Sequence, residues 1–481
     1  MLSIKKQKWC LLATMLLVTF FTLTTCGKSS DTYESDANTE ISLHVLIPHS
    51  YYNVFRQAER AMAREFAARG MSFTLNITYY TSDDDMQAIN TRLNVMLMAG
   101  QGYDLFLWHY QPIHSFADNG FLTDFYTLID NHPTTRREDF FINVLEAYEH
   151  RSGLYAFPLS FGFEYIGIHS GLPESITSSF LSLDTVALHE IFALYNRLQY
   201  DYSDYNHLDM GNTFNLRSAS FALMITIGDY IDVENQTASI NSDEFVQILE
   251  SIGRVFIGTD FWINSQYPSR GPTHDYLTRA SMDYAFLNFG NAFGPMAAIF
   301  DMVEPGFNHF IPLINSNGNL LINPTPFISS VAGGGWGAVC IPAASDGELA
   351  WEFVQHLISA IVTLQNPSDL VQHSMLTSLT IPISREYFRP HIESVINRVV
   401  SRYRGQLPFA GISGGRVDSH AMEAAIARLE VLSEMPASIF ELRLPEALVT
   451  SGTFEAFFMG LITAEEAALE MHNIVSLWLI E

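Results

Sequence analysis

The sequence predicts an α/β protein of two lobes, in which mostly parallel sheets are flanked by helices. Its 481 residues exceed the size at which a single hydrophobic core stops growing, so we expect two lobes. Hydrophobic residues make up 48% of the chain and aromatic residues 13%, which is enough for a large core and excludes disorder for most of the chain. The order of strand and helix patterns after residue 40 is the third argument.

Strand and helix patterns alternate between residues 41 and 108. Apolar residues occupy every second position in 41–47 and 73–79, and 104–108 (Asp-Leu-Phe-Leu-Trp) has the composition of a buried strand, so we expect three strands. The ranges 55–66 and 86–97 have apolar residues at helical spacing, and glycines follow both. This order predicts a parallel sheet covered by helices, and ligands bind beyond the carboxyl ends of such strands. That edge would hold His49, Tyr51, Trp108, His109 and Tyr110.

The later part of the chain contains two further amphipathic patterns, which predict helices at 346–359 and 463–481. The middle, roughly 160–330, is rich in aromatic residues and mixes helical with short-strand patterns. The order of its elements between 165 and 275 stays open. Beyond the N-terminal segment, no apolar run is long enough to predict a membrane span.

The N-terminal segment has the pattern of an export signal. Lys5, Lys6 and Lys8 precede an apolar run over 9–23, and the run ends in Leu23-Thr24-Thr25-Cys26. This arrangement resembles the bacterial lipoprotein signal, which implies that residues 1–25 are removed and that Cys26 carries a diacylglyceryl group. The alternatives are an uncleaved membrane anchor, for which the run is shorter than the ~20 residues a span needs, and a plain secretory signal. Residues 26–40 are polar and acidic, and we expect a disordered tether that reaches at most ~50 Å.

Charge and cysteine content exclude several classes of function. The net charge is −27, which disfavours nucleic acid and anionic lipid headgroups as partners and otherwise serves solubility. The three cysteines are Cys10, Cys26 and Cys340. Removal of the signal and lipidation of Cys26 leave Cys340 alone, so the sequence predicts neither a disulfide framework nor a thiolate zinc site. We expect no cofactor.

Six segments in order resemble the maltose-binding-type family of extracellular solute-binding proteins, the receptors of ABC importers. The first is a helix, an Ala-Gly turn at Ala99-Gly100 and a following strand. The others are an element after that strand, two segments where the chain crosses between lobes, a helix of the first lobe and the C-terminal helices. The six segments are 92–106, 120–125, 153–160, 348–353, 379–385 and 457–467.

The resemblance implies a two-lobed, periplasmic-binding-protein-like fold with a hinge of several crossings. We expect lobe 1 to comprise 41–158 and 332–380, and lobe 2 to comprise 159–331 and 381–481. A solute, with a carbohydrate as the first expectation, would bind in the cleft and close the lobes, and the closed form would deliver it to the permease subunits of an ABC importer. The protein would be a monomer and not an enzyme, held at the outer face of the cell membrane by the lipid on Cys26.

Sugars bind to aromatic ring faces with a few carboxylates and amides that fix orientation. Trp108 follows the third predicted strand and matches a family position that lines the cleft, and Trp336 lies in the glycine-rich run 333–337. For each aromatic candidate the alternative is core packing, and for Glu164 it is a solvated carboxylate. Trp351, on the buried stripe of its helix, is expected in the core. The expected ligand-binding residues are Trp108, His109, Tyr110, Phe163, Glu164, Trp336, His49, Tyr51, Asn288 and Phe289.

Two alternative functions remain, a surface-anchored hydrolase (glycosidase or esterase) and a sensory or adhesive module on the same fold. Ser413 lies in a Gly-x-Ser-x-Gly pattern, but a nucleophile there needs a strand before it and a helix after it, and the flanking residues favour a loop. His189-Glu190 begins a zinc-protease pattern that lacks its second histidine. His109 and His114 lack further ligands, so we expect no metal site. Paired carboxylates for glycoside hydrolysis are spatial and are not excluded.

Overall fold

The structure is a computed structural model, and the parts of the chain that it describes lie between residues 40 and 480. They are 40–81, 84, 86–107, 113–163, 166–169, 172–181, 197–198, 200–202, 223, 227–228, 230–233, 235–256, 287–289, 310–313, 320–323, 338–363, 381–402, 412–413, 416–417, 419–434, 437–438, 448 and 452–480.

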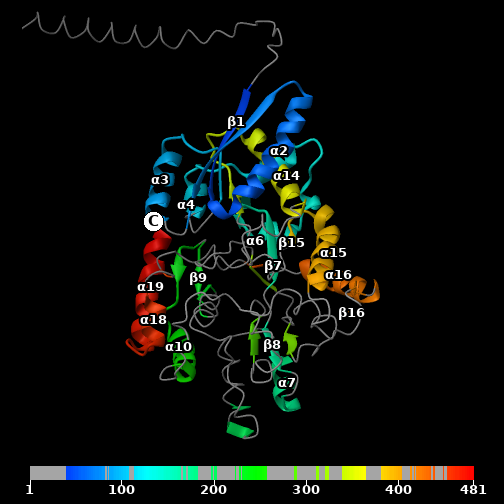
Figure 1. Ribbon diagram of the computed structural model, residues 1–481. Coiled ribbons are helices and arrows are strands. Elements are labelled where there is room, and N and C mark those ends of the chain that lie inside the picture. Colours follow the sequence, from blue (N-terminus) through cyan, green and yellow to red (C-terminus); the bar gives the residue numbers. More distant parts are fainter. Residues whose placement is uncertain are drawn as a thin grey trace, which may run out of the picture.

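A five-stranded sheet forms the upper part of the molecule in the order β2-β1-β3-β14-β6 (Figure 1). Its strands are β1 (Glu40–Pro48), β2 (Ser72–Tyr80), β3 (Leu105–Leu107), β14 (Ala338–Cys340) and β6 (Phe157–Pro158). The second strand in this order, β1, pairs in parallel with β2 and β3, as the sequence predicts, because a helix connects each strand to the next. β14 is antiparallel to both β3 and β6.

Helices lie on both sides of this sheet. Figure 1 shows α2 and α14 to one side of β1, and α3 and α4 to the other. The predicted helices 55–66, 86–97 and 346–359 are confirmed as parts of α2, α3 and α14. The helical elements of this part are η1 (His49–Tyr51), α2 (Tyr52–Ala68), α3 (Met86–Met98), α4 (Ile113–Asp118), α5 (Phe125–Asn131), η2 (Arg137–Asp139), α6 (Ile142–Ala147) and α14 (Gly347–Thr363).

The core between α14 and the sheet is aromatic. The Trp351 side chain is 1% exposed, and its ring centroid lies 5.1 Å from that of Phe157 and 5.8 Å from that of Phe125. The prediction that Trp351 packs in the core is therefore confirmed. Phe353, two residues further along α14, packs against Phe55 of α2 at a centroid distance of 5.7 Å. These contacts explain why the apolar stripes of α2 and α14 face each other.

Two smaller sheets continue the chain below the first. One has the order β15-β7-β13-β18 and the other β11-β8-β12. In them only β13 and β18 pair in parallel, so the α/β class is confirmed while the sheets together are mixed rather than mostly parallel. Strands from distant parts of the chain meet here, and a helical crossover does not set their direction. The bounds are β7 (Ser160–Phe163), β8 (Ile166–His169), β11 (Leu287–Phe289), β12 (Phe310–Leu313), β13 (Leu320–Asn323), β15 (Ile381–Pro382) and β18 (Ala437–Ser438).

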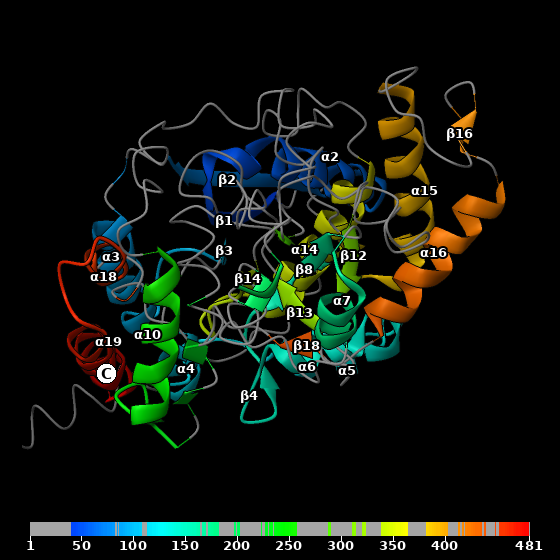
Figure 2. The same ribbon diagram turned by 90° about the horizontal axis from the view of Figure 1, so that it is seen from below.

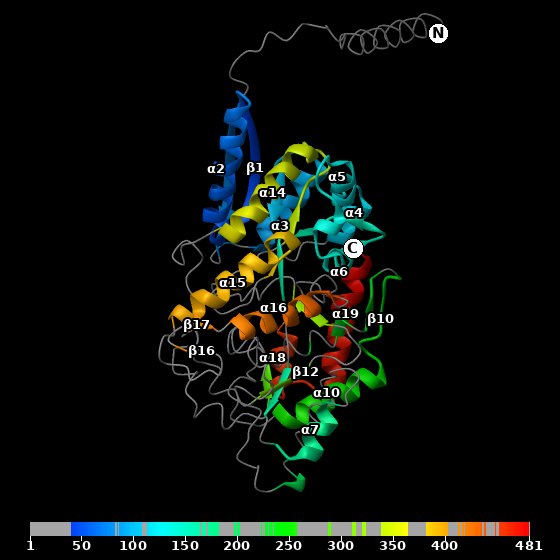
Figure 3. The same ribbon diagram turned by 90° about the vertical axis from the view of Figure 1, so that its right-hand side faces the viewer.

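The C-terminal helices pack beside α10, as the views from below and from the side agree (Figures 2 and 3). The predicted helix 463–481 is confirmed as α19. Among the described helices, none combines the length and the apolar character that crossing a membrane requires. The remaining elements are β4 (Glu149–His150), β5 (Gly153–Leu154), α7 (Glu174–Leu181), β9 (Ile231–Asp232), β10 (Thr237–Ala238), α10 (Asp243–Phe256), α15 (Arg385–Arg402), β16 (Ile412–Ser413), β17 (Arg416–Val417), α16 (Ser419–Ser433), α18 (Thr453–Phe458) and α19 (Ala464–Ile480).

The chain changes sheets at the buried residue Leu159. Before it, β6 pairs with β14 of the five-stranded sheet, and after it, β7 pairs with β15 of the four-stranded sheet. The expected lobe boundaries at 158/159 and 380/381 fall at these strands, whereas the boundary at 331/332 lies outside the described residues. The division into lobes itself stays a prediction.

Arg385, the first residue of α15, connects three segments near this change of sheet. Its Nε donates to the carbonyl of Phe140 at 2.8 Å, its guanidinium lies 4.6 Å from the Phe141 ring centroid, and it pairs with both carboxylate oxygens of Glu434. Nearby, the Asn143 amide donates to the carbonyl of Ser433 at 2.8 Å. The end of α16 is thereby held against residues 140–143.

Candidate ligand-binding site

Three aromatic side chains gather where β1 and β2 end. In the parallel register Ile47 lies beside Tyr79 and Pro48 beside Tyr80, so the residues that follow β1 meet the end of β2. The ring centroids of His49 and Tyr79 are 4.7 Å apart, those of Tyr52 and Tyr79 are 6.0 Å apart, and His49 stacks on Tyr52 at 6.2 Å. We call His49, Tyr52 and Tyr79 the aromatic rim.

The aromatic rim faces solvent. Tyr79 is 51% exposed and His49 is exposed, whereas Tyr52 is half-buried. Side chains alternate across a strand, so the next residue, Tyr80, points inward and is buried. Burial raises the pKa of the Tyr80 phenol, and the neighbouring Tyr51 adds to that rise. The rim rings therefore lie on the surface above a tyrosine pair that belongs to the core.

A polar network between α2 and β2 supports the Tyr52 ring. The Arg56 guanidinium lies 5.1 Å from the Tyr52 ring centroid and donates to Glu59 at 2.7 Å and to the carbonyl of Leu75 at 3.0 Å. Glu59 also accepts from the backbone N–H of Leu75 at 2.9 Å. Because these bonds join α2 to β2, the rim is supported by two elements rather than by a loop.

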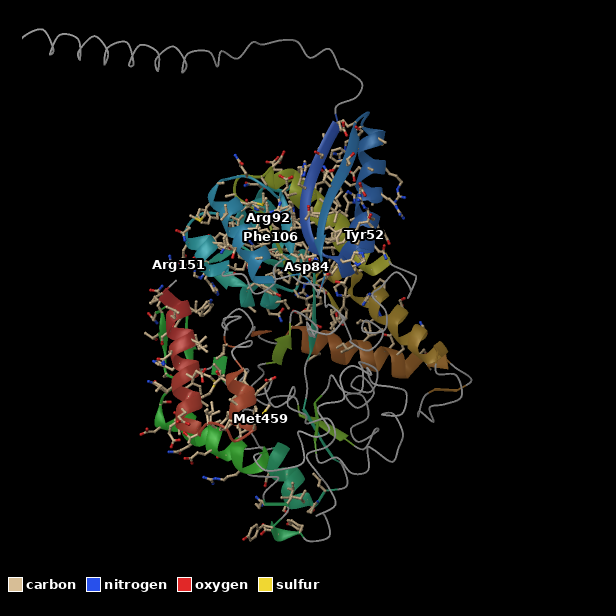
Figure 4. The ribbon with its side chains drawn as sticks, turned by 60° about the vertical axis from the view of Figure 1, so that its left-hand side comes forward. Tyr52, Asp84, Arg92, Phe106, Arg151 and Met459 are labelled. Atoms are coloured by element: carbon tan, nitrogen blue, oxygen red, sulfur yellow. The ribbon has the colours of Figure 1, made fainter. Side chains whose placement is uncertain are left out.

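A carboxylate lies near the same edge. Asp84 accepts from the backbone N–H of Thr81 at 2.6 Å and from its hydroxyl at 2.9 Å, and these bonds hold the pKa of the Asp84 carboxyl below its ordinary value. Figure 4 shows Tyr52 and Asp84 at the lower border of the upper part, on the side toward Met459. An ionised, exposed carboxylate beside aromatic rings suits a ligand that offers hydroxyl donors and apolar ring faces.

The predicted residues after β1 separate into one exposed and one buried residue. His49 is part of the aromatic rim, whereas Tyr51 is 4% exposed and faces the core, because successive side chains of the 3₁₀ turn η1 point in different directions. His49 thus lies at the expected edge. The ligand-binding role of both residues stays a prediction.

The other predicted residues are described in part or not at all. Phe163 ends β7, and Asn288 and Phe289 lie in β11, but only their backbone is described. β7 and β11 belong to different sheets. Six expected positions lie outside the described residues, namely Cys26, Trp108, His109, Tyr110, Glu164 and Trp336.

Sequence reasoning missed Tyr52, Tyr79 and Asp84. The available signal was the parallel pairing itself, because the strand ranges 41–47 and 73–79 have equal length and end at the same edge. Aligning their ends places Tyr79 beside the residues that follow β1. The alternation in 73–79 by itself predicts Tyr79 only as a strand residue.

In the described part of the chain, Ser413 does not lie at the kind of turn that an esterase nucleophile requires. Ser413 lies in β16, which pairs with Arg416 and Val417 of β17 as a small antiparallel ladder. A nucleophile of the Gly-x-Ser-x-Gly type sits between a strand and a helix instead. Within the described ranges, no group of three His, Cys, Asp or Glu side chains is arranged to hold a metal ion.

Comparison with solved structures supports the fold. The chain is similar to a periplasmic oligogalacturonide-binding protein from Yersinia enterocolitica, with a TM-score of 0.51 and 10% identity over 92% of this chain and 99% of that one. It is also similar to an extracellular solute-binding protein family 1 member from Alicyclobacillus acidocaldarius, with a TM-score of 0.49, 11% identity and coverage of 92% and 99%. A third structure is an ABC transporter solute-binding protein from Thermotoga lettingae bound to α-D-tagatose, with a TM-score of 0.45, 13% identity and coverage of 92% and 100%.

No protein-family model and no curated protein matches the sequence. At 10% identity, the likeness to the Yersinia protein shows the fold alone. The chain has the fold of the extracellular solute-binding proteins, so the fold class that the resemblance implies is confirmed, while the lobe boundaries and the hinge stay predictions.

Proposed function

We propose that this protein is the carbohydrate-binding receptor of an ABC importer. The observation that carries the proposal is the exposed aromatic rim with Asp84 at the carboxyl edge of β1 and β2. In parallel α/β sheets this is the edge at which ligands bind. The structurally similar Yersinia protein, which binds oligogalacturonide, supports a saccharide as the solute.

Recognition would proceed by closure of two lobes. The first lobe, 41–158 with 332–380, contributes the aromatic rim, Asp84 and the expected Trp108, His109 and Tyr110. The second, 159–331 with 381–481, contributes Phe163, Glu164, Asn288 and Phe289, and Trp336 approaches from the first. A ligand that contacts both lobes stabilises the closed state by its extra contacts there. The closed state is the one that would dock on the permease.

The protein would act outside the cell. Lipidation of Cys26 would anchor it to the outer face of the membrane, and 26–40 would serve as the tether. Replacement of Cys26 by Ser is expected to move the protein from the membrane fraction to the medium. Retention of the Cys26→Ser chain in the membrane would contradict the lipid anchor and favour an uncleaved helix.

Thermal unfolding with a panel of saccharides tests the binding role. The panel comprises glucose, xylose, galacturonic acid and N-acetylglucosamine, each as monomer and as tetramer. A ligand at 100 times its dissociation constant should add ~2.7 kcal/mol to the free energy of unfolding. The full chain is measured in a non-glycosidic detergent. A melting temperature unchanged by every member of the panel would contradict carbohydrate binding.

A further inference from the structure

The ends of β2 and β3 are separated by the width of the strand between them. β1 pairs with β2 on one side and with β3 on the other. Neighbouring strands lie about 4.8 Å apart, so the carboxyl ends of β2 and β3 are about 10 Å apart. Tyr79 lies at the end of β2, and Trp108 follows β3 directly in the sequence. The edge is thus wider than one six-membered ring.

The three rings of the aromatic rim differ in how much surface they offer. Tyr52 is half-buried and contacts both Arg56, 5.1 Å from its ring centroid, and His49, which stacks on it at an interplanar angle of 21°. Tyr79 meets Tyr52 edge-on at 77° and keeps half of its surface in solvent. Of the two tyrosines, Tyr79 therefore offers more surface to a ligand, and the exposed His49 lies next to it.

We infer that Tyr79, with His49 beside it, is a sugar subsite of its own at the outer end of the edge, so that the protein selects saccharides of two or more rings. This inference rests on the proposed function, since it divides the same edge into subsites. A monosaccharide bound at the end of β3 leaves Tyr79 uncovered. A longer saccharide reaches both positions and gains the additional ring contact.

The expected gain in affinity follows from the strength of ring stacking on Tyr79. A ring stacked on Tyr79 contributes at the scale of an aromatic pair, which corresponds to roughly two- to tenfold in the dissociation constant. Loss of the Tyr79 ring should weaken binding of the longer saccharide by this factor. It should leave the monosaccharide affinity unchanged. Tyr79→Phe keeps the ring and should retain most of the affinity.

Calorimetric titration of the full chain tests the subsite. Glucose and galacturonic acid are each titrated as monomer, dimer and tetramer into the wild type, Tyr79→Ala, Tyr79→Phe and a control, Tyr200→Ala. Tyr200 is 93% exposed and lies outside the aromatic rim. Melting temperatures without ligand check that each variant folds. We expect the preference for dimer or tetramer over monomer to fall in Tyr79→Ala alone.

Two results would overturn the inference in distinguishable ways. If a saccharide binds but Tyr79→Ala keeps the wild-type ratio of tetramer to monomer affinity, the subsite is wrong and the proposed function stands. If neither saccharide series binds to the wild type in titration, and none of the wider panel raises its melting temperature, the proposed function fails and the subsite fails with it.

Discussion

Trp351 packs its indole among the rings of Phe125, Phe140 and Phe157, with centroid distances of 5.1–6.2 Å. Among the described residues, its Nε1 has no hydrogen-bond partner. Trp351→Ala removes the ring and should lower the free energy of unfolding by about 3–5 kcal/mol. Trp351→Phe keeps much of the packing and removes the unpaired donor, so it should cost far less. Urea unfolding measures both, and equal losses would contradict this account of the core.

Glu434 gives the fold a pH-dependent contribution. The hydrogen bonds and charge of Arg385 hold the pKa of the Glu434 carboxyl below its ordinary value, which is about 4.3 in an unfolded chain. A depressed folded-state pKa stabilises the protein above the unfolded value, and this stability is lost as pH falls through the folded-state pKa. The contribution should be present at pH 6 and decline below about pH 4.3.

Glu434→Gln should therefore destabilise the protein at pH 6 and show a smaller further loss on acidification than the wild type. Melting temperatures between pH 6 and pH 3 measure the difference. Glu470→Gln, an exposed residue of α19, is the control and should follow the wild-type curve. Parallel curves for wild type and Glu434→Gln would show that the Arg385 pair adds no acid dependence.

At the scale of single elements, the turn that follows α3 requires a glycine. Gly102 has φ +116°, and an added Cβ would lie 3.0 Å from Sδ and 3.1 Å from Cβ of Met96. Gly70, which ends α2, has φ +76°, and no described atom lies within 4 Å of such a Cβ. Gly70→Ala should cost about 1 kcal/mol from backbone strain alone, and Gly102→Ala more than about 2 kcal/mol, because it adds the contact with Met96. Chemical unfolding measures both, and equal costs would contradict a role for the contact.

The elements that the sequence predicts well are those with a long, regular apolar period. The ranges 41–47, 55–66 and 73–79 became β1, α2 and β2 because each has one face to bury against the same core. The two-residue strands such as β6 and β15 have no such period, and their pairing depends on segments far away in the chain. The same limit explains why only part of the candidate site follows from the sequence. His49 follows from its own strand, whereas Tyr79 requires the register between two strands.

At the scale of the whole molecule, the proposed receptor has two states. Leu159 and Ile383 are buried where the chain passes between sheets, and the bonds of Arg385 hold the end of α16 against residues 140–143. Motion between the lobes would therefore be confined to a few backbone positions. Saturating saccharide should reduce the radius of gyration measured by X-ray scattering, since the closed lobes are more compact. The radius of gyration of the monomer without ligand is the reference value. An unchanged radius of gyration with bound ligand would argue for a rigid body.

Cys340 lies in β14, between β3 and β6 of the five-stranded sheet, and its burial raises the pKa of the thiol well above its ordinary value. The thiolate is the nucleophile that attacks thiol reagents, so Cys340 should not react with them while the chain is folded. In the proposed mature protein, which would lack Cys10 and carry a lipid on Cys26, Cys340 would be the sole free thiol. The rate at which a disulfide reagent modifies Cys340 would then report how often the five-stranded sheet opens, without an introduced label. Saccharides that tighten the receptor should slow that reaction.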